Sequence, residues 1–270
     1  MAWSAGLPLG LTVAAGVLYA VALRRFARLD RERLWRAASF YGGLAVILLA
    51  LEPPLDDYAD TLFSMHMVQH VLLLTVAPPL LVFGRPWLRV WRPFPLRFRR
   101  RAARAAVRAG RSRPLGFLWR PVVSWTLLNA TLIAWHIPAA YDAAVRNEAV
   151  HALEHLSFLG TAIVFWGQVL GAPPLRARLT NIQRAAFVWL AMIPGWILAI
   201  VLAFASRPLY PAYGDLASRP WHLDAMGDQA IAAGVMWVPG SIAYLITIVV
   251  LVYRWLEHDN AAAEPAAGTR

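Results

Sequence analysis

The feature that most constrains this chain is a succession of apolar segments, each near the ~20 residues that a helix needs to cross a bilayer. Only 15% of the residues are charged, whereas soluble domains carry roughly 25%. The segments follow one another too closely to leave room for a separate soluble domain. The sequence therefore predicts an all-α integral membrane protein, a bundle of about seven transmembrane helices. The predicted spans are Leu7–Leu23, Leu34–Leu51, Leu62–Gly84, Trp119–Pro138, Ala149–Gly171, Ala185–Ala205 and Gln229–Trp255.

The arginines predict how these spans are oriented. The chain has 26 basic residues, all of them arginine, and they gather in the first, third and fifth links and near the C-terminus. The exceptions are Arg146, Arg207 and Arg219. Since cytoplasmic loops are enriched in Lys and Arg, we expect the N-terminus outside and the C-terminus in the cytoplasm.

The net charge of +11 could also indicate a nucleic-acid partner. The arginines, however, lie between the apolar segments, where the positive-inside rule places them. We therefore predict no nucleic-acid partner and take the lipid bilayer as the surroundings. Residues 1–257 are predicted to form the transmembrane domain, and the Ala/Glu/Pro-rich segment 258–270 a disordered cytoplasmic tail.

Histidines gather on the predicted outer side of the membrane. His66 and His70 form an i,i+4 pair in the third segment, and His151 and His155 form another in the fifth. Such pairs share a helix face, with Cβ atoms ~5–6 Å apart, and two imidazoles so placed can bind one metal ion. At ~1.5 Å per residue, both pairs and His136 lie at similar depth. Ionisable groups inside spans are costly and usually functional, so these five histidines are the predicted metal ligands.

Other side chains nearby could complete such a site. Glu154 lies between His151 and His155 and could orient an imidazole. The further candidates are Met67, His222, Asp228 and Met236. The chain has no cysteine, which excludes a thiolate site and a disulfide. Histidine with methionine suits copper, but imidazoles alone suit zinc equally well, and histidines on two helices could also hold haem.

Four motifs, in order between about residues 62 and 240, resemble the multi-span CtaG family, which is linked to assembly of caa3-type cytochrome c oxidase. They are Met65–His70 with Ala77–Leu81, Trp135–Pro138 with Tyr141–Asp142, His151–Phe158, and Asp228–Gln229 with Met236–Gly240. The resemblance implies a factor of the bacterial plasma (inner) membrane that binds copper through the five outer-leaflet histidines. It also implies delivery of that copper to the oxidase subunit that carries the copper centre, and it favours copper over zinc.

Two alternatives stay open. The first is copper transport across the membrane along kinked helices, since Pro78-Pro79, Pro194-Gly195 and Pro239-Gly240 interrupt three spans. The second is a membrane-embedded zinc hydrolase, because His151-Ala-Leu-Glu154-His155 matches a zinc-protease pattern. A hydrolase needs an open metal position, which two histidine pairs would fill. We therefore expect no enzyme and no catalytic residue.

Overall fold

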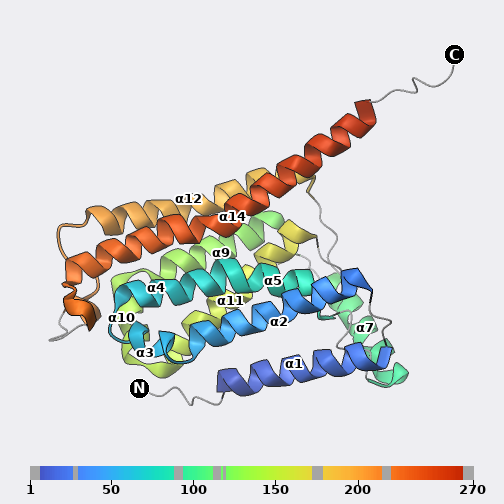
Figure 1. Ribbon diagram of the computed structural model, residues 1–270, viewed down its shortest axis with the longest axis horizontal. Coiled ribbons are helices and arrows are strands. Elements are labelled where there is room, and N and C mark those ends of the chain that lie inside the picture. Colours follow the sequence, from blue (N-terminus) through green and yellow to red (C-terminus); the bar gives the residue numbers. More distant parts are fainter. Residues whose placement is uncertain are drawn as a thin grey trace.

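The computed structural model describes residues 7–26, 30–87, 94–111, 117, 120–171, 179–214 and 220–263. Every element in these ranges is helical, and the long helices lie side by side in a bundle (Figure 1). In chain order the elements are α1 (Leu7–Phe26), α2 (Arg31–Leu51), α3 (Leu55–Ala59), α4 (Phe63–Val71), η1 (Leu72–Val76), α5 (Ala77–Gly84), α7 (Leu96–Arg111), α9 (Pro121–Trp135), α10 (Pro138–Arg146), α11 (Glu148–Leu170), α12 (Asn181–Phe204), α13 (Pro211–Gly214), η2 (Pro220–His222) and α14 (Ala225–Ala263).

Within the described ranges, five helices are long and apolar enough to cross a membrane: α2, the continuous α4–η1–α5 helix, α11, α12 and α14. The pair α9 and α10 makes a sixth if it is one broken span. α1 is apolar over the shorter stretch Pro8–Leu23. The predicted all-helical architecture is confirmed, and each predicted apolar segment lies on one of these helices. By length and composition, five or six of them qualify as spans.

Two consecutive prolines shape the helix that carries the first histidine pair. Pro78 and Pro79 have no N–H, so carbonyls one turn earlier lose their helical donors. The chain opens there into a π-helical turn, Leu72–Val76. The indole Nε1 of Trp166 on α11 donates to the carbonyl of Leu74 at 2.9 Å, which replaces one missing bond. The interrupted helix is thereby fixed to α11.

The predicted fourth span, Trp119–Pro138, breaks before its end. α9 stops at Trp135, and α10 leaves at an angle of 75°. Pro138 cannot donate to the helical ladder and disfavours the helical conformation in the residue before it. Ile137 is accordingly extended, with φ −66° and ψ 126°. His136 lies at this break, buried, so its position is set by the proline.

Close helix contacts hold the bundle together. Gly84 packs against α2 so tightly that an added Cβ would lie 2.7 Å from the Cβ of Phe40. A second close contact joins α11 and α14, where Trp166 stacks on Tyr244 with ring centroids 5.3 Å apart. Through Trp166, α11 therefore contacts both the π-helical turn after α4 and the helix α14.

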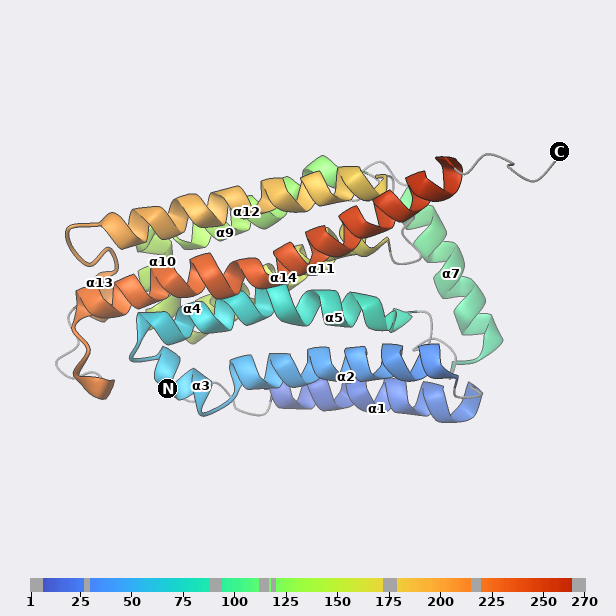
Figure 2. The same cartoon turned by 45° about the horizontal axis from the view of Figure 1, so that its top comes forward.

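The two ends of the bundle differ in charge. The short helix α3 carries Asp56 and Asp57, and it lies at the same end as α10 and α13. Figure 2 shows the arginine-rich helix α7 at the opposite end. The acidic second link and the arginine-rich third link thus lie on opposite sides of the apolar bundle.

The last helix is longer than its predicted span. α14 continues past Trp255 to Ala263, so the first part of the segment predicted as a disordered tail, 258–270, is helical. Residues 264–270 lie outside the described part of the chain.

Candidate metal centre

Two helices turn polar side chains into the bundle and apolar ones outward. On α11, Glu154 is 0% exposed, whereas Leu153 is 58% and Leu156 is 64% exposed. The side chain of Asn147 accepts hydrogen bonds from the first N–H groups of α11, which fixes where the helix begins. A polar inner face with an apolar outer face is the arrangement that a membrane requires.

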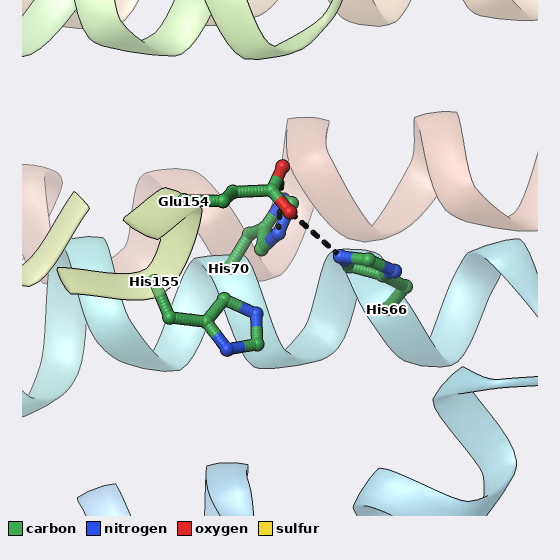
Figure 3. Close-up of side chains that lie close together, drawn as sticks. All are labelled: His66, His70, Glu154 and His155. Carbon is green, nitrogen blue, oxygen red and sulfur yellow. Dashed lines mark ion pairs between the residues drawn. The ribbon is translucent and has the colours of Figure 1, made fainter. Parts of the chain in front are cut away.

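Four inward side chains from these two helices form one group: His66 and His70 from α4, and Glu154 and His155 from α11 (Figure 3). Each offers one ligand atom, and these atoms all lie within 4.8 Å of one another. Nε2 of His66 and Nε2 of His70 are each 3.5 Å from a carboxylate oxygen of Glu154. Ligands ~2.0 Å from a tetrahedral metal lie ~3.3 Å apart, so a small inward movement would close the group on an ion.

The group leaves buried polar atoms unsatisfied. Nε2 of His66, His70 and His155 and both oxygens of Glu154 have no hydrogen-bond partner among the described residues. An orphaned buried polar atom costs about 1–3 kcal/mol, and here several of them converge on one point. A cation bound at that point would stabilise such a set. Three imidazoles and a carboxylate fit Zn(II) or Cu(II), so the group could hold a metal ion.

Tyr213 of α13 fixes the tautomer of the His66 ring. Burial raises the pKa of the Tyr213 phenol well above its usual value, so the hydroxyl keeps its proton. The hydroxyl donates that proton to the carbonyl of Ala59 at 2.6 Å. Its oxygen lies 2.9 Å from Nδ1 of His66 and therefore accepts from Nδ1–H. Nε2 of His66 is left with a free lone pair, the form in which imidazole ligates a metal.

The remaining predicted ligands occupy different places. The ring of His151 lies 4.2 Å from that of His155 and 5.0 Å from that of His66, so His151 flanks the group. His136 lies further along, with its ring 5.9 Å from that of His70. Its Nε2 faces Sδ of Met67 at 3.4 Å. The five predicted histidines are thus neighbours, but three of them share the group with Glu154.

The other secondary candidates have separate positions. The buried carboxylate of Asp228 accepts the backbone N–H groups of Phe63 and Ser64 at 2.7 and 3.0 Å. It therefore caps the start of α4. Met236 lines a small cavity beside His136. His222 is exposed in η2, next to Trp221, which stacks on Tyr58 of α3.

Sequence reasoning missed Tyr213. Its partner His66 is far away in the chain, and no spacing rule connects a residue in a loop to a helix before it. The available signal was weaker: Tyr141, Tyr210 and Tyr213 lie in the links that the sequence predicts to be on the outer side, in a chain with few polar residues. All three are buried around Phe63 and His66.

The chain resembles mycobacterial proteins without an assigned role. It is 26% identical over 266 residues to an uncharacterized protein of Mycobacterium bovis (Mb0105), covering 96% of this chain and 39% of that protein. An uncharacterized protein of Mycobacterium leprae (ML1998) is 22% identical over 238 residues, covering 84% of this chain and 35% of that protein. The chain thus spans about two fifths of the length of these curated relatives. No solved structure matches it.

A family model described as the cytochrome c oxidase caa3 assembly factor (Caa3_CtaG) matches residues 17–258. This range contains all the helices from α2 to α13 and every candidate ligand named above. The motifs that suggested the family in the sequence lie around the buried histidine group, on α4, at the break before α10, on α11 and at the start of α14. On this match over most of its length, the chain belongs to the Caa3_CtaG family of cytochrome c oxidase caa3 assembly factors.

Proposed function

We propose that this protein is a copper-handling assembly factor of the bacterial plasma membrane. Copper from the outer side would bind to the group of His66, His70, Glu154 and His155 and then pass to the oxidase subunit that carries the copper centre. The proposal rests on one observation. Buried ring nitrogens and carboxylate oxygens of these four residues converge on one point and have no hydrogen-bond partners in the described part of the chain. The family supports the choice of copper and of the oxidase as recipient.

The location of the group supports exchange with the outer side. α4 begins at the end of the bundle that carries α3, α10 and α13, and α7 lies at the other end. With α7 on the cytoplasmic side, as the positive-inside rule expects, seven spans would place the N-terminus outside and the C-terminus inside. The histidines would then lie just below the outer surface, within reach of a partner docked there.

The residues of the group suit delivery by ligand exchange. The Glu154 carboxylate offsets part of the charge of a bound cation, which is costly to bury unpaired. The imidazoles of His66 and His155 come from different helices, so they can release the ion one at a time to ligands of the recipient. No covalent step is needed.

A zinc hydrolase is the second candidate, because Glu154 lies in a zinc-protease pattern. A general base must face an open metal position and its water. In this structure both oxygens of Glu154 instead face the ring nitrogens of His66 and His70. Glu154 is therefore placed as a ligand or charge partner, and the geometry favours metal holding over hydrolysis.

Elemental analysis of protein purified without chelator tests the proposal. We expect copper in the wild type and its loss in the double variant His66→Ala/His155→Ala. His222→Ala, which removes an exposed imidazole, is the matched control. In cells, the double variant should lower the copper content of the oxidase. Zinc in place of copper, together with an unchanged oxidase, would contradict the proposal.

A further inference from the structure

A second set of potential metal ligands lies next to the histidine group and faces away from it. Nδ1 of His136 is 2.8 Å from the carbonyl of Leu132. A carbonyl can only accept, so Nδ1 carries the proton and Nε2 of the neutral ring has a free lone pair. That lone pair faces Sδ of Met67 at 3.4 Å. Two Lewis bases therefore point at each other with no proton between them.

The distance between these two atoms fits a shared metal ion. A metal ~2.0 Å from a nitrogen and ~2.3 Å from a sulfur holds them about 3.5 Å apart at the tetrahedral angle. The alternative is a protonated His136 that donates to the sulfur. That would bury a positive charge in the apolar bundle, which is costly. The described carboxylate that could offset this charge, Glu154, faces His66 and His70 instead.

A cavity of about 60 Å³ opens beside this pair. One ordered water needs roughly 10–15 Å³ of such volume, so the space is ample for an ion. Besides Met67 and His136, its walls include His70, Met192 and Met236. Three thioethers from three helices, α4, α12 and α14, thus converge on one cavity with two imidazoles.

The chemistry of the walls selects the ion. The lining residues include no carboxylate, so nothing there neutralises a divalent cation. Thioether sulfur is a soft, uncharged ligand that prefers Cu(I) among biological metals. The neighbouring group with Glu154 has the opposite character, since imidazole and carboxylate suit divalent ions.

We propose that His136 and Met67, with Met192 and Met236 around the same cavity, form a second metal position that is selective for a soft monovalent ion such as Cu(I). His70 connects the two positions, because it lines the cavity and also belongs to the group with Glu154. The inference deepens the proposed function by naming the oxidation state of the copper, but the second position depends only on its own ligands. A divalent ion would occupy the group with Glu154, and an ion that arrives as Cu(I) would occupy the sulfur ligands.

Binding of two probe ions to the purified full-length protein tests this assignment. Ag(I) serves as a redox-silent substitute for Cu(I), and Zn(II) reports on the group with Glu154. Met67→Leu/Met236→Leu removes two sulfurs with little change in volume. It should lower Ag(I) affinity by at least about tenfold, because losing even a residue that only supports a metal ligand typically costs that much. The same variant should keep its Zn(II) affinity. His155→Ala should show the reverse, and Met226→Leu, at the start of α14 and outside the cavity lining, is the matched control.

X-ray absorption of the Ag(I)- or Cu(I)-loaded wild type gives a readout that needs no variant. We expect sulfur as well as nitrogen in the first coordination shell. A shell without sulfur, or an unchanged Ag(I) affinity in Met67→Leu/Met236→Leu, would overturn the second position. If the Ag(I) results hold while His66→Ala/His155→Ala leaves oxidase copper unchanged in cells, the second position stands and the proposed delivery function fails.

Discussion

The phenol oxygen of Tyr213 lies 2.9 Å from Nδ1 of His66, although 147 positions separate the two residues in the chain. The same hydroxyl donates to the carbonyl of Ala59 at 2.6 Å. Tyr213 therefore joins a loop between α12 and α14, the short helix α3 and a metal-ligand candidate on α4. The candidate metal centre is positioned in this way by a residue outside the group of His66, His70, Glu154 and His155.

Tyr213→Phe should weaken binding of a divalent ion by about 10–100-fold, the usual cost of losing a group that orients a ligand. The reason is that His66 would lose the acceptor that fixes its tautomer. Tyr210→Phe is the control, because it also removes a buried hydroxyl, but one that donates to the backbone carbonyl of His136 at 3.1 Å. Titration of the purified variants with Zn(II) and Cu(II) measures the effect. Equal losses in both variants would show that Tyr213 acts through packing alone.

Glu154→Gln separates delivery from catalysis. The substitution keeps the shape and one acceptor oxygen but removes the charge that faces His66 and His70. For a copper-delivery protein, we expect weaker metal binding and lower oxidase activity in cells, with recovery when copper is added to the medium. For a hydrolase, the metal would stay bound and no amount of copper would restore activity. Copper titration of oxidase activity, with bound metal measured in parallel, distinguishes the two, and a fully metallated but inactive variant would rule out delivery.

The stability of the protein should depend on the charge of Asp56. Burial raises the pKa of this carboxyl above its usual range, against the hydrogen bond from Gln69 that lowers it. A carboxyl with a raised folded-state pKa stabilises the fold when protonated and loses that contribution as the pH rises through the folded-state value. Asp56→Asn keeps an acceptor for Gln69 and cannot ionise. It should therefore raise the thermal midpoint at pH 7, and the gain should vanish below pH ~4, where the wild-type carboxyl is protonated even when unfolded.

Asp57→Asn removes the same charge from an exposed position on the same helix. Because the charge of Asp57 also raises the pKa of Asp56, this variant should show a smaller gain of the same sign. Thermal unfolding in detergent between about pH 3 and pH 8 gives the comparison. A lower midpoint for Asp56→Asn at pH 7 would show that the protein uses this carboxylate in its charged form.

Asp228→Ala should destabilise the protein by at least about 2 kcal/mol. The carboxylate accepts two buried N–H groups at the start of α4, and leaving a buried donor unsatisfied costs about 1–3 kcal/mol. Because α4 carries His66 and His70, metal affinity should fall as well. Denaturant titration in detergent measures the loss. Asp224→Ala, which removes an exposed acceptor at the start of α14, should cost less; a similar cost for both would argue against a special role of the cap.

The orientation can be tested with reporter fusions. A reporter placed after Arg101 should be cytoplasmic, because the arginine-rich third link is retained on the inner side. One placed within residues 213–219 should be external. The opposite result would place the histidine group at the inner face and exclude delivery from outside.

Much of this architecture could be predicted because membrane helices obey simple length and polarity rules. The predicted segment Leu62–Gly84 and the described helix from Phe63 to Gly84 differ by one residue at the start. Inward histidines were also predictable, since a polar side chain within a span must avoid lipid. The i,i+4 spacing brought His66 and His70 to one face, as the structure shows.

The local geometry could not be predicted in the same way. The break at His136 keeps this residue beside His70 but turns its Nε2 towards Met67, which depth along a straight helix does not reveal. Asp228 looked like a possible ligand, yet it caps α4 from α14. Both outcomes depend on contacts between helices that are far apart in the chain, and single-sequence periodicity contains no information on those contacts.

The π-helical turn Leu72–Val76 sets the direction in which His66 and His70 point around the axis of their helix. Such a turn holds one residue more than an α-helical turn, and each residue rotates the chain by about 100° around the axis. Deleting one residue there would swing His66 and His70 away from Glu154 while leaving Pro78 in place against its neighbours. Insertion of one would do the same in the other direction. The number of residues between His70 and Pro78 therefore matters to the candidate metal centre as much as the donor atoms themselves.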